Sequence, residues 1–178
     1  MAWEPDYATV EDLRGYVRVE DTLDDAQMAL AITAASRAID RFCGRQFGND
    51  EQTRVYESVD GVAIVDDLSR IDEVKLNGRV VDAKPWPFNA AAAGRPYERL
   101  SLPRDGEVEV AGMFGWPEIP DAVKQACLLQ ASRFLARRDS PFGVAGSPDF
   151  GGELRLLAKV DADVAVILAS YRRVWGAV

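Results

Sequence analysis

The sequence contains no histidine and only two cysteines among its 178 residues. Without imidazole, Ser-His-Asp and Cys-His catalytic sites cannot form, and neither can a histidine-ligated metal site. Cys43 and Cys127 each lie within a helical pattern. We expect two buried free thiols, because cysteine is usually buried; the two could also form one disulfide, which nothing in the sequence requires.

Long apolar runs are also absent. No run approaches the ~18 residues that a membrane helix needs. Residues 1–6 are acidic and lack the charged-then-apolar order of a signal peptide. We therefore expect a protein that is made and used in the cytoplasm, or in something assembled there, with no membrane partner.

The chain has no basic run, and its net charge is −8. Residues 1–90 carry 10 Lys/Arg against 18 Asp/Glu, whereas residues 91–178 carry 11 of each. Affinity for nucleic acid comes largely from lysine and arginine on phosphates. We therefore expect poor DNA binding, although such a chain could line a space through which DNA passes.

The remaining candidates for chemistry are weak. Gly143 to Ser147 has spaced glycines but no Gly-Lys-Ser/Thr and follows no strand, which argues against a phosphate loop. Asp24-Asp25 and Asp161/Asp163 stand at helix starts, where the helix dipole favours acids, so we interpret them as caps rather than metal ligands. A glycosidase-type carboxylate pair is compatible with the spacing, but nothing favours one. We expect no catalytic residue, no cofactor and no metal.

Four segments have helical patterns. Thr9 is a candidate cap for a short first helix, and a second start at Thr22 precedes a stripe of residues 28, 32, 35, 39 and 42 that should stop at Gly44. A third helix has Pro120 in its first turn and ends near residues 137–138. A last helix begins at Asp161 and continues through Trp175.

Residues 53–113 have strand patterns instead. Asp60-Gly61 and Asn77-Gly78 each lie between apolar runs and predict hairpins. We expect a third hairpin from residues 100–102 and 107–110, and an irregular excursion over residues 85–96. The predicted fold is α+β: a small bundle of four helices with an antiparallel β insertion between helices 2 and 3. Residues 1–48 and 116–178 would form the helical core, and residues 49–115 the inserted β subdomain.

The stretch from Arg137 to Gly152 separates the last two helices and has no period of its own. Its four glycines and two prolines predict a loop, yet it carries Phe142 and Phe150, which linkers rarely contain. We interpret it as a hinge and docking arm that becomes ordered against a partner. The candidate partner interface is Phe142, Phe150, Tyr171, Arg172, Arg173 and Trp175.

Four segments of the sequence resemble the head–tail connector (adaptor) proteins of tailed bacteriophages. They are residues 7–13, residues 34–47, residues 137–144, and residues 160–164 with 171–173. The resemblance implies a structural protein of the virion neck, assembled in the bacterial host cytoplasm. It implies a ring of twelve copies beneath the portal, contacting the portal and the next tail-proximal ring, with DNA passing through. It implies no catalytic residues, and it does not account for the large β insertion.

Several functions therefore stay open. A ring-forming connector between portal and tail is the first hypothesis. A head-closure (stopper) or tail-completion protein is the second. A non-viral module that grips a ligand with the β insertion and Trp86 is the third, and an enzyme with a carboxylate pair is a distant fourth.

Overall fold

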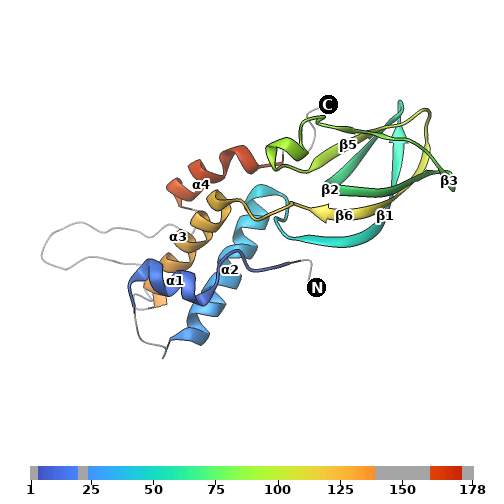
Figure 1. Cartoon of the computed structure of the whole chain (residues 1–178). Helices are drawn as coiled ribbons and strands as arrows, with labels where there is room; N and C mark the ends of the chain where they lie inside the picture. The colour runs from blue at the N-terminus through green and yellow to red at the C-terminus, as the bar shows by residue number, and fades with distance from the viewer. Residues whose placement is uncertain (1–3, 20–23, 139–160, 174–178) are drawn as a thin grey trace, which may run out of the picture. The chain divides into compact units, whose positions relative to one another are not determined.

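The computed structural model describes residues 4–19, 24–138 and 161–173 (Figure 1). The described chain forms two compact units: a β unit of Gln46–Ile119 together with Glu4 and Pro5, and a helical unit of Asp6–Arg45 together with the described residues from Pro120 on. Its elements comprise four α-helices and an antiparallel sheet that lies between α2 and α3 in the chain. The predicted α+β class, with a β insertion between the second and third helices, is confirmed.

The helical unit contains α1 (Val10–Val17), α2 (Asp25–Cys43), α3 (Asp121–Arg138) and α4 (Ala162–Leu168), followed by the 3-10 turn η3 (Ala169–Tyr171). Thr9 caps α1 through a capping box, in which its hydroxyl accepts from the Asp12 N–H and the Asp12 carboxylate accepts from the Thr9 N–H. Gly44 ends α2 in the left-handed conformation with φ of 65°. Both ends agree with the sequence prediction.

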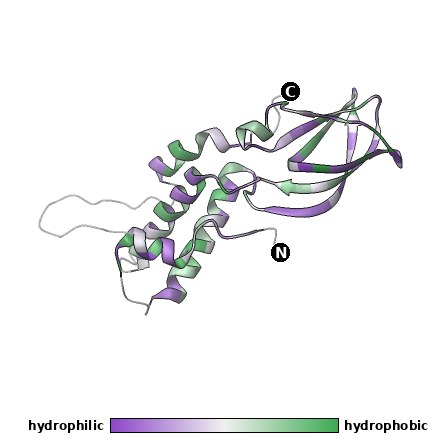
Figure 2. Cartoon of the chain, viewed as in Figure 1, coloured by the Kyte–Doolittle hydropathy of each residue, from purple (hydrophilic) through white to green (hydrophobic). Residues whose placement is uncertain are grey.

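The predicted apolar stripe of α2 lies in the core of the helical unit. Met28, Ile32, Ala35 and Ile39 are buried, and α2 packs on α3 while α1 contacts both. Figure 2 shows hydrophobic and hydrophilic residues alternating along the helices, as expected for helices with one apolar face. Alanines in this stripe allow the backbones of neighbouring helices to approach closely.

The last helix is shorter than predicted. It ends at Leu168, η3 continues to Tyr171, and Arg172 is extended, whereas the sequence predicted helix through Trp175. The Arg173 N–H donates to the Cys43 carbonyl oxygen at 2.7 Å. In a continuing helix this N–H would donate to a carbonyl oxygen of the preceding turn, so the tertiary hydrogen bond replaces an intrahelical one. Trp175 lies outside the described residues.

The β unit contains six strands. They are β1 (Asn49–Val59), β2 (Val62–Leu76), β3 (Arg79–Val80), β4 (Lys84–Trp86), β5 (Tyr97–Ser101) and β6 (Gly106–Gly115). The sheet order is β1-β6-β2-β5-β4, with β3 paired to β2 and a further short pairing between β1 and β2. All of these pairings are antiparallel.

Two of the three predicted hairpins are confirmed. The turn Asp60-Gly61 joins β1 to β2, and the turn Asn77-Gly78 joins β2 to β3. All four turn residues have φ between 50° and 76°, as a type I′ turn requires.

The third predicted hairpin is wrong. β5 pairs with β2 and β4, and β6 pairs with β1 and β2, so these two segments are strands that do not pair with each other. The reason is β2, a continuous strand of 15 residues that the sequence pattern had divided in two. Its first half pairs with β5 and its second half with β6, and each of the two pairings contains a register shift. Long-range pairing with β2 therefore overrides the local turn signal. The predicted excursion over residues 85–96 is also partly regular, because it includes β4 and the turn η1 (Ala91–Ala93).

The core of the β unit is made of inward-facing residues from β2, β5 and β6. Its buried members are Ala63, Val65, Leu68, Val74, Leu76, Leu100, Val108, Val110 and Phe114. Along β1, exposed residues alternate with partly buried ones, because successive strand residues point to opposite sides of the sheet.

Candidate partner interface

The segment that carries the described candidate residues begins at the start of α4. Asp161 caps this helix: its carboxylate accepts from the Asp163 N–H at 2.7 Å. Arg133 of α3 forms an ion pair with the same Asp161 carboxylate. One acidic side chain therefore both starts α4 and fixes it to α3. The sequence indicated the cap but gave no signal for the ion pair.

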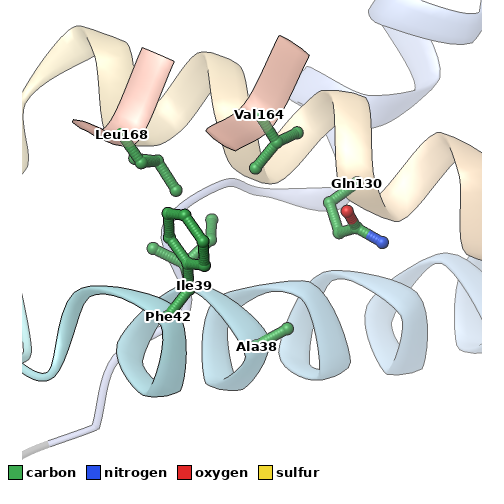
Figure 3. Close-up of a pocket in the computed structure, with 6 residues that line it drawn as sticks. All are labelled: Ala38, Ile39, Phe42, Gln130, Val164 and Leu168. Carbon is green, nitrogen blue, oxygen red and sulfur yellow. The ribbon is translucent and has the colours of Figure 1, made fainter. Parts of the chain in front are cut away.

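Two apolar residues attach α4 to the rest of the helical unit. Val164 and Leu168 are fully buried, whereas Val166 on the opposite side is 77% exposed. A small apolar crevice lies beside them (Figure 3). Its lining residues are Ala38, Ile39, Phe42, Gln130, Val164 and Leu168.

Gln130 is the polar member of this lining. Its side chain extends from α3 toward α2 (Figure 3) and is only 5% exposed. Among the described residues, its Oε1 atom has no hydrogen-bond partner. A buried amide oxygen without a donor is costly. The signal for this position was visible in the sequence as a polar residue on the apolar stripe of α3.

The structure brings three candidate residues together at the end of η3. The Arg172 guanidinium carbon lies 5.1 Å from the centre of the Phe42 ring, and the Arg173 N–H bonds to Cys43. Tyr171 is half-buried beside them. All three follow α4, and Arg172 and Arg173 contact the C-terminal end of α2. Phe142 and Phe150, like Trp175, lie outside the described residues, as does most of the 137–152 loop.

Both thiols lie in the helical unit and are free and buried, as predicted. Burial raises the pKa of Cys43 to about 12, although nearby Arg45 opposes the shift. Burial also raises the pKa of Cys127, whose sulfur lies 3.5 Å from the Ser36 hydroxyl. Since the thiolate is the reactive form of cysteine, neither residue is arranged as a nucleophile.

The β unit contains one half-buried polar network. Arg54 donates to the Asp66 carboxylate at 2.6 Å, and the Tyr56 hydroxyl donates to the same oxygen at 3.1 Å. Burial, followed by the Asp66 charge, raises the pKa of Tyr56 to about 12. Arg54 also lies over the Phe114 ring, 4.5 Å from its centre. The network connects β1 to β2 and has the character of a structural brace.

The described ranges hold neither a candidate metal cluster nor a candidate membrane span. They contain no group of three or more His, Cys, Asp and Glu side chains placed to hold a metal. No helix in the described part of the chain is long and apolar enough to span a bilayer.

Three of the four segments that resemble phage connectors meet in the helical unit. Tyr7, from the first segment, donates its backbone N–H to Ser36 Oγ at 3.0 Å and its hydroxyl to Asp40, both in the second. The last segment reaches the second through Arg172 and Arg173. Residues that are far apart in the sequence therefore form one contiguous set of contacts.

A comparison with known protein families gives a match over nearly the whole chain. The family described as "Head completion protein" matches residues 6–174. The chain belongs to the head completion protein family. Comparison with individually curated proteins gives no match.

Membership of the head completion family fixes the general role. This is a phage head–tail family, in agreement with the resemblance to connector proteins. The protein is a structural component of the virion that acts at head closure and interacts with other phage head or tail proteins. The family is not typically enzymatic.

Proposed function

We propose that the protein assembles into a ring that joins the portal to the tail and forms part of the DNA channel. The observation that carries this proposal is the family match over residues 6–174, which includes both units. A ring is the expected form because the capsid vertex and the tail meet on a common axis, and a closed cyclic assembly repeats one heterologous contact around that axis. We expect twelve copies.

The charge of the chain supports a passive channel. At −8 per copy, twelve copies would carry about −96. Such a ring repels the phosphate backbone, so that DNA moves through without being held.

We assign the two regions of the chain different tasks. Residues 1–48 and 116–178 would form the connector core, whose helices pack side by side around the ring. Residues 49–115 form an inserted β subdomain that gives each copy a second surface. The contact between copies in the ring would then depend on the helices, and the choice of partner would depend on the inserted β subdomain.

The C-terminal segment is the proposed contact to the portal or to the next ring. Arg172 is exposed, and while the face of its guanidinium lies over Phe42, the N–H groups in the guanidinium plane can donate to acidic groups of a partner. Tyr171 and Arg173 lie next to it. Phe142, Phe150 and Trp175 complete the proposed interface.

The proposal is tested by measuring mass in solution, alone and with purified portal protein. We expect a ring-sized complex when portal is present, and its loss when Arg172 is changed to Glu. Arg104→Glu, a charge reversal in a loop of the β unit, is the matched control and should leave assembly intact. A chain that stays monomeric at high concentration with portal present would overturn the proposal.

A stopper or tail-completion protein is the second candidate. The family description favours it, because "head completion" names the closure step itself. A connector should bind isolated portal directly, whereas a stopper should need the connector ring first. Pull-down of the chain on immobilised portal, with and without the other neck proteins, separates the two positions.

A further inference from the structure

β1 is paired along one side only. Residues 49–58 pair with residues 115–106 of β6, whereas the pairing with β2 is limited to Ser58–Ala63 and Val59–Val62, next to the turn. Within the described ranges, no strand lies beside the other edge of β1 from residue 49 to residue 56 (Figure 1). We call this the β1 edge.

The backbone groups at the β1 edge belong to the odd-numbered residues. The Trp116 N–H donates to the Gly48 oxygen, in register with the adjacent Asn49–Gly115 pair. Hydrogen-bonded and non-hydrogen-bonded pairs alternate along an antiparallel ladder, so the even-numbered residues of β1 direct their N–H and C=O groups to β6. The residues that direct theirs to the β1 edge are therefore Asn49, Glu51, Thr53 and Val55, whereas the outward groups of Glu57 face β2 next to the Ser58–Ala63 pair.

The opposite end of the sheet is protected, and the β1 edge is not. The outermost strand there, β4, has three residues, and one of them is Pro85, which has no N–H to donate. β1 has 11 residues and contains neither proline nor lysine, the residues that usually blunt an edge. An unprotected edge of this length is a template for another strand.

The side chains along the β1 edge add apolar and acidic contacts. Val55 is 59% exposed. Glu57 stands directly opposite Glu107 of β6, an unfavourable pairing of like charges, and within the described ranges neither makes an ion pair. The neighbouring Glu109, by contrast, is paired with Lys75 at 2.9 Å. A cation beside Glu57 and Glu107 would remove the repulsion.

The inner side of β1 is already braced. Arg54 and Tyr56 point inward, where both bond to Asp66 of β2. These side chains hold β1 in its extended form without occupying the outward backbone groups. A strand that adds to a rigid edge loses less entropy than one that must first order it.

We propose that the β1 edge is a strand-addition site for an extended segment of a partner protein that carries lysine or arginine at every second residue. The backbone of that segment bonds to the odd-numbered residues of β1. Its basic groups lie beside Glu57 and Glu107, and their aliphatic stems cover Val55. The site belongs to the β unit and does not depend on the proposed ring.

The first test uses a labelled peptide of about nine residues in which lysine and valine alternate. Its binding to the full chain is measured by fluorescence anisotropy at ~0.15 M salt. The comparison peptide is methylated at the backbone nitrogen of each lysine. This change keeps the side-chain charge but removes the backbone N–H donors that would bond to β1. We expect binding about tenfold tighter for the unmodified peptide. Equal affinity of the two peptides would show attraction by charge alone and would overturn the proposal, as would no binding of either.

The second test changes the protein. Thr53→Pro removes one outward N–H and leaves the bonds to β6 intact, so it should weaken peptide binding about tenfold. Thr53→Val keeps the N–H and is the matched control, expected to bind like the parent. An unchanged affinity in the folded proline variant would contradict strand addition.

Amide hydrogen exchange in the unaltered chain gives a readout that needs no variant. Peptide binding should slow exchange at Glu51, Thr53 and Val55, while Gln52 and Arg54 are already protected by β6. Protection that fails to follow this alternation would overturn the proposal. None of these measurements involves portal or ring formation, so a failure here is distinct from a failure of the proposed function.

Discussion

Trp116 donates its indole N–H to the carboxylate of Asp67 at 3.2 Å, and both side chains are almost completely buried. The bond connects the end of β6 to the middle of β2. The Trp116 ring also lies 5.3 Å from the ring of Phe47. One side chain therefore donates a hydrogen bond to a buried carboxyl oxygen and packs against an aromatic neighbour.

We predict that Trp116→Phe lowers the free energy of unfolding of the β unit by about 1–3 kcal/mol, because it removes a donor from a buried carboxylate and keeps an aromatic ring. Urea unfolding followed by circular dichroism measures the change. Trp86→Phe is the matched control, because Trp86 is 43% exposed, and it should cost less than about 0.5 kcal/mol. Equal costs at the two positions would contradict the role of the Asp67 bond.

This pair also shows where sequence reasoning stops. The cap at Thr9, the stop at Gly44 and the turns at Asp60-Gly61 and Asn77-Gly78 were predictable, because each depends on the local conformational preference of a few adjacent residues. The bond from Trp116 to Asp67 joins residues that are 49 positions apart, and no local pattern encodes it.

The candidate interface was predictable to a similar extent. The sequence located the start of the last helix at Asp161, because a cap is a local signal. It did not indicate that Arg172 lies on Phe42 or that Arg173 bonds to Cys43, contacts that end the helix early. The sequence did not predict that β5 pairs with β2 for the same reason, since strand partners depend on the whole sheet.

Gly112 and Gly15 should respond to alanine with opposite signs. A Cβ at Gly112 would lie 2.1 Å from the Arg70 carbonyl oxygen, whereas a Cβ at Gly15 in α1 would meet nothing within 4 Å. We expect Gly112→Ala to destabilise the β unit by at least about 2 kcal/mol, because backbone must move. Gly15→Ala should stabilise α1 by about 0.5–1 kcal/mol. Thermal unfolding measures both, and a destabilising Gly15→Ala would contradict the open environment.

Asp12 should make the helical unit sensitive to acid. The hydrogen bond from the Thr9 backbone, followed by those from Lys124 and the Thr9 side chain, lowers the pKa of Asp12 below 3.8. Since the folded pKa lies below the unfolded one, the stabilisation is present above the unfolded pKa and is lost as pH falls through the folded pKa. We expect Asp12→Asn to have a shallower loss of stability below about pH 4.

Urea midpoints measured across this pH range test the prediction. Glu11→Gln is the control, because it removes the same charge from the same helical turn but leaves the capping box of Thr9 and Asp12 in place. It should keep the steep acid profile of the parent chain. An equally steep profile for Asp12→Asn would show that other groups carry the acid dependence.

The two thiols should report opening of the helical unit. Cys43 and Cys127 are buried, and the pKa of Cys43 is raised to about 12, so little thiolate is accessible near pH 8. We expect labelling by a disulfide reagent at least about 100-fold slower in the native chain than in urea. The variant Cys127→Ala isolates the signal of Cys43. Rapid labelling of native Cys43 would show that the contact between Arg173 and the end of α2 opens readily.

Gln130 offers a test of how α4 is held. Its amide oxygen is buried without a partner among the described residues, in a crevice whose other lining residues are apolar. Leucine has nearly the same volume and no polar atom. We therefore predict that Gln130→Leu raises the free energy of unfolding of the helical unit by about 1–2 kcal/mol, because it removes the cost of an unsatisfied buried oxygen.

Two comparison variants make the cause visible. Gln130→Ala removes the amide but enlarges the crevice beside Val164 and Leu168, so it should destabilise the helical unit by about 1 kcal/mol or more. Gln130→Glu keeps the shape and adds a buried charge, so it should be the least stable of the three variants near neutral pH. Thermal and urea unfolding rank the set. If the Gln130→Leu variant is less stable than the parent chain, the Gln130 amide makes favourable bonds in the folded chain. The attachment of α4 would then be polar rather than apolar.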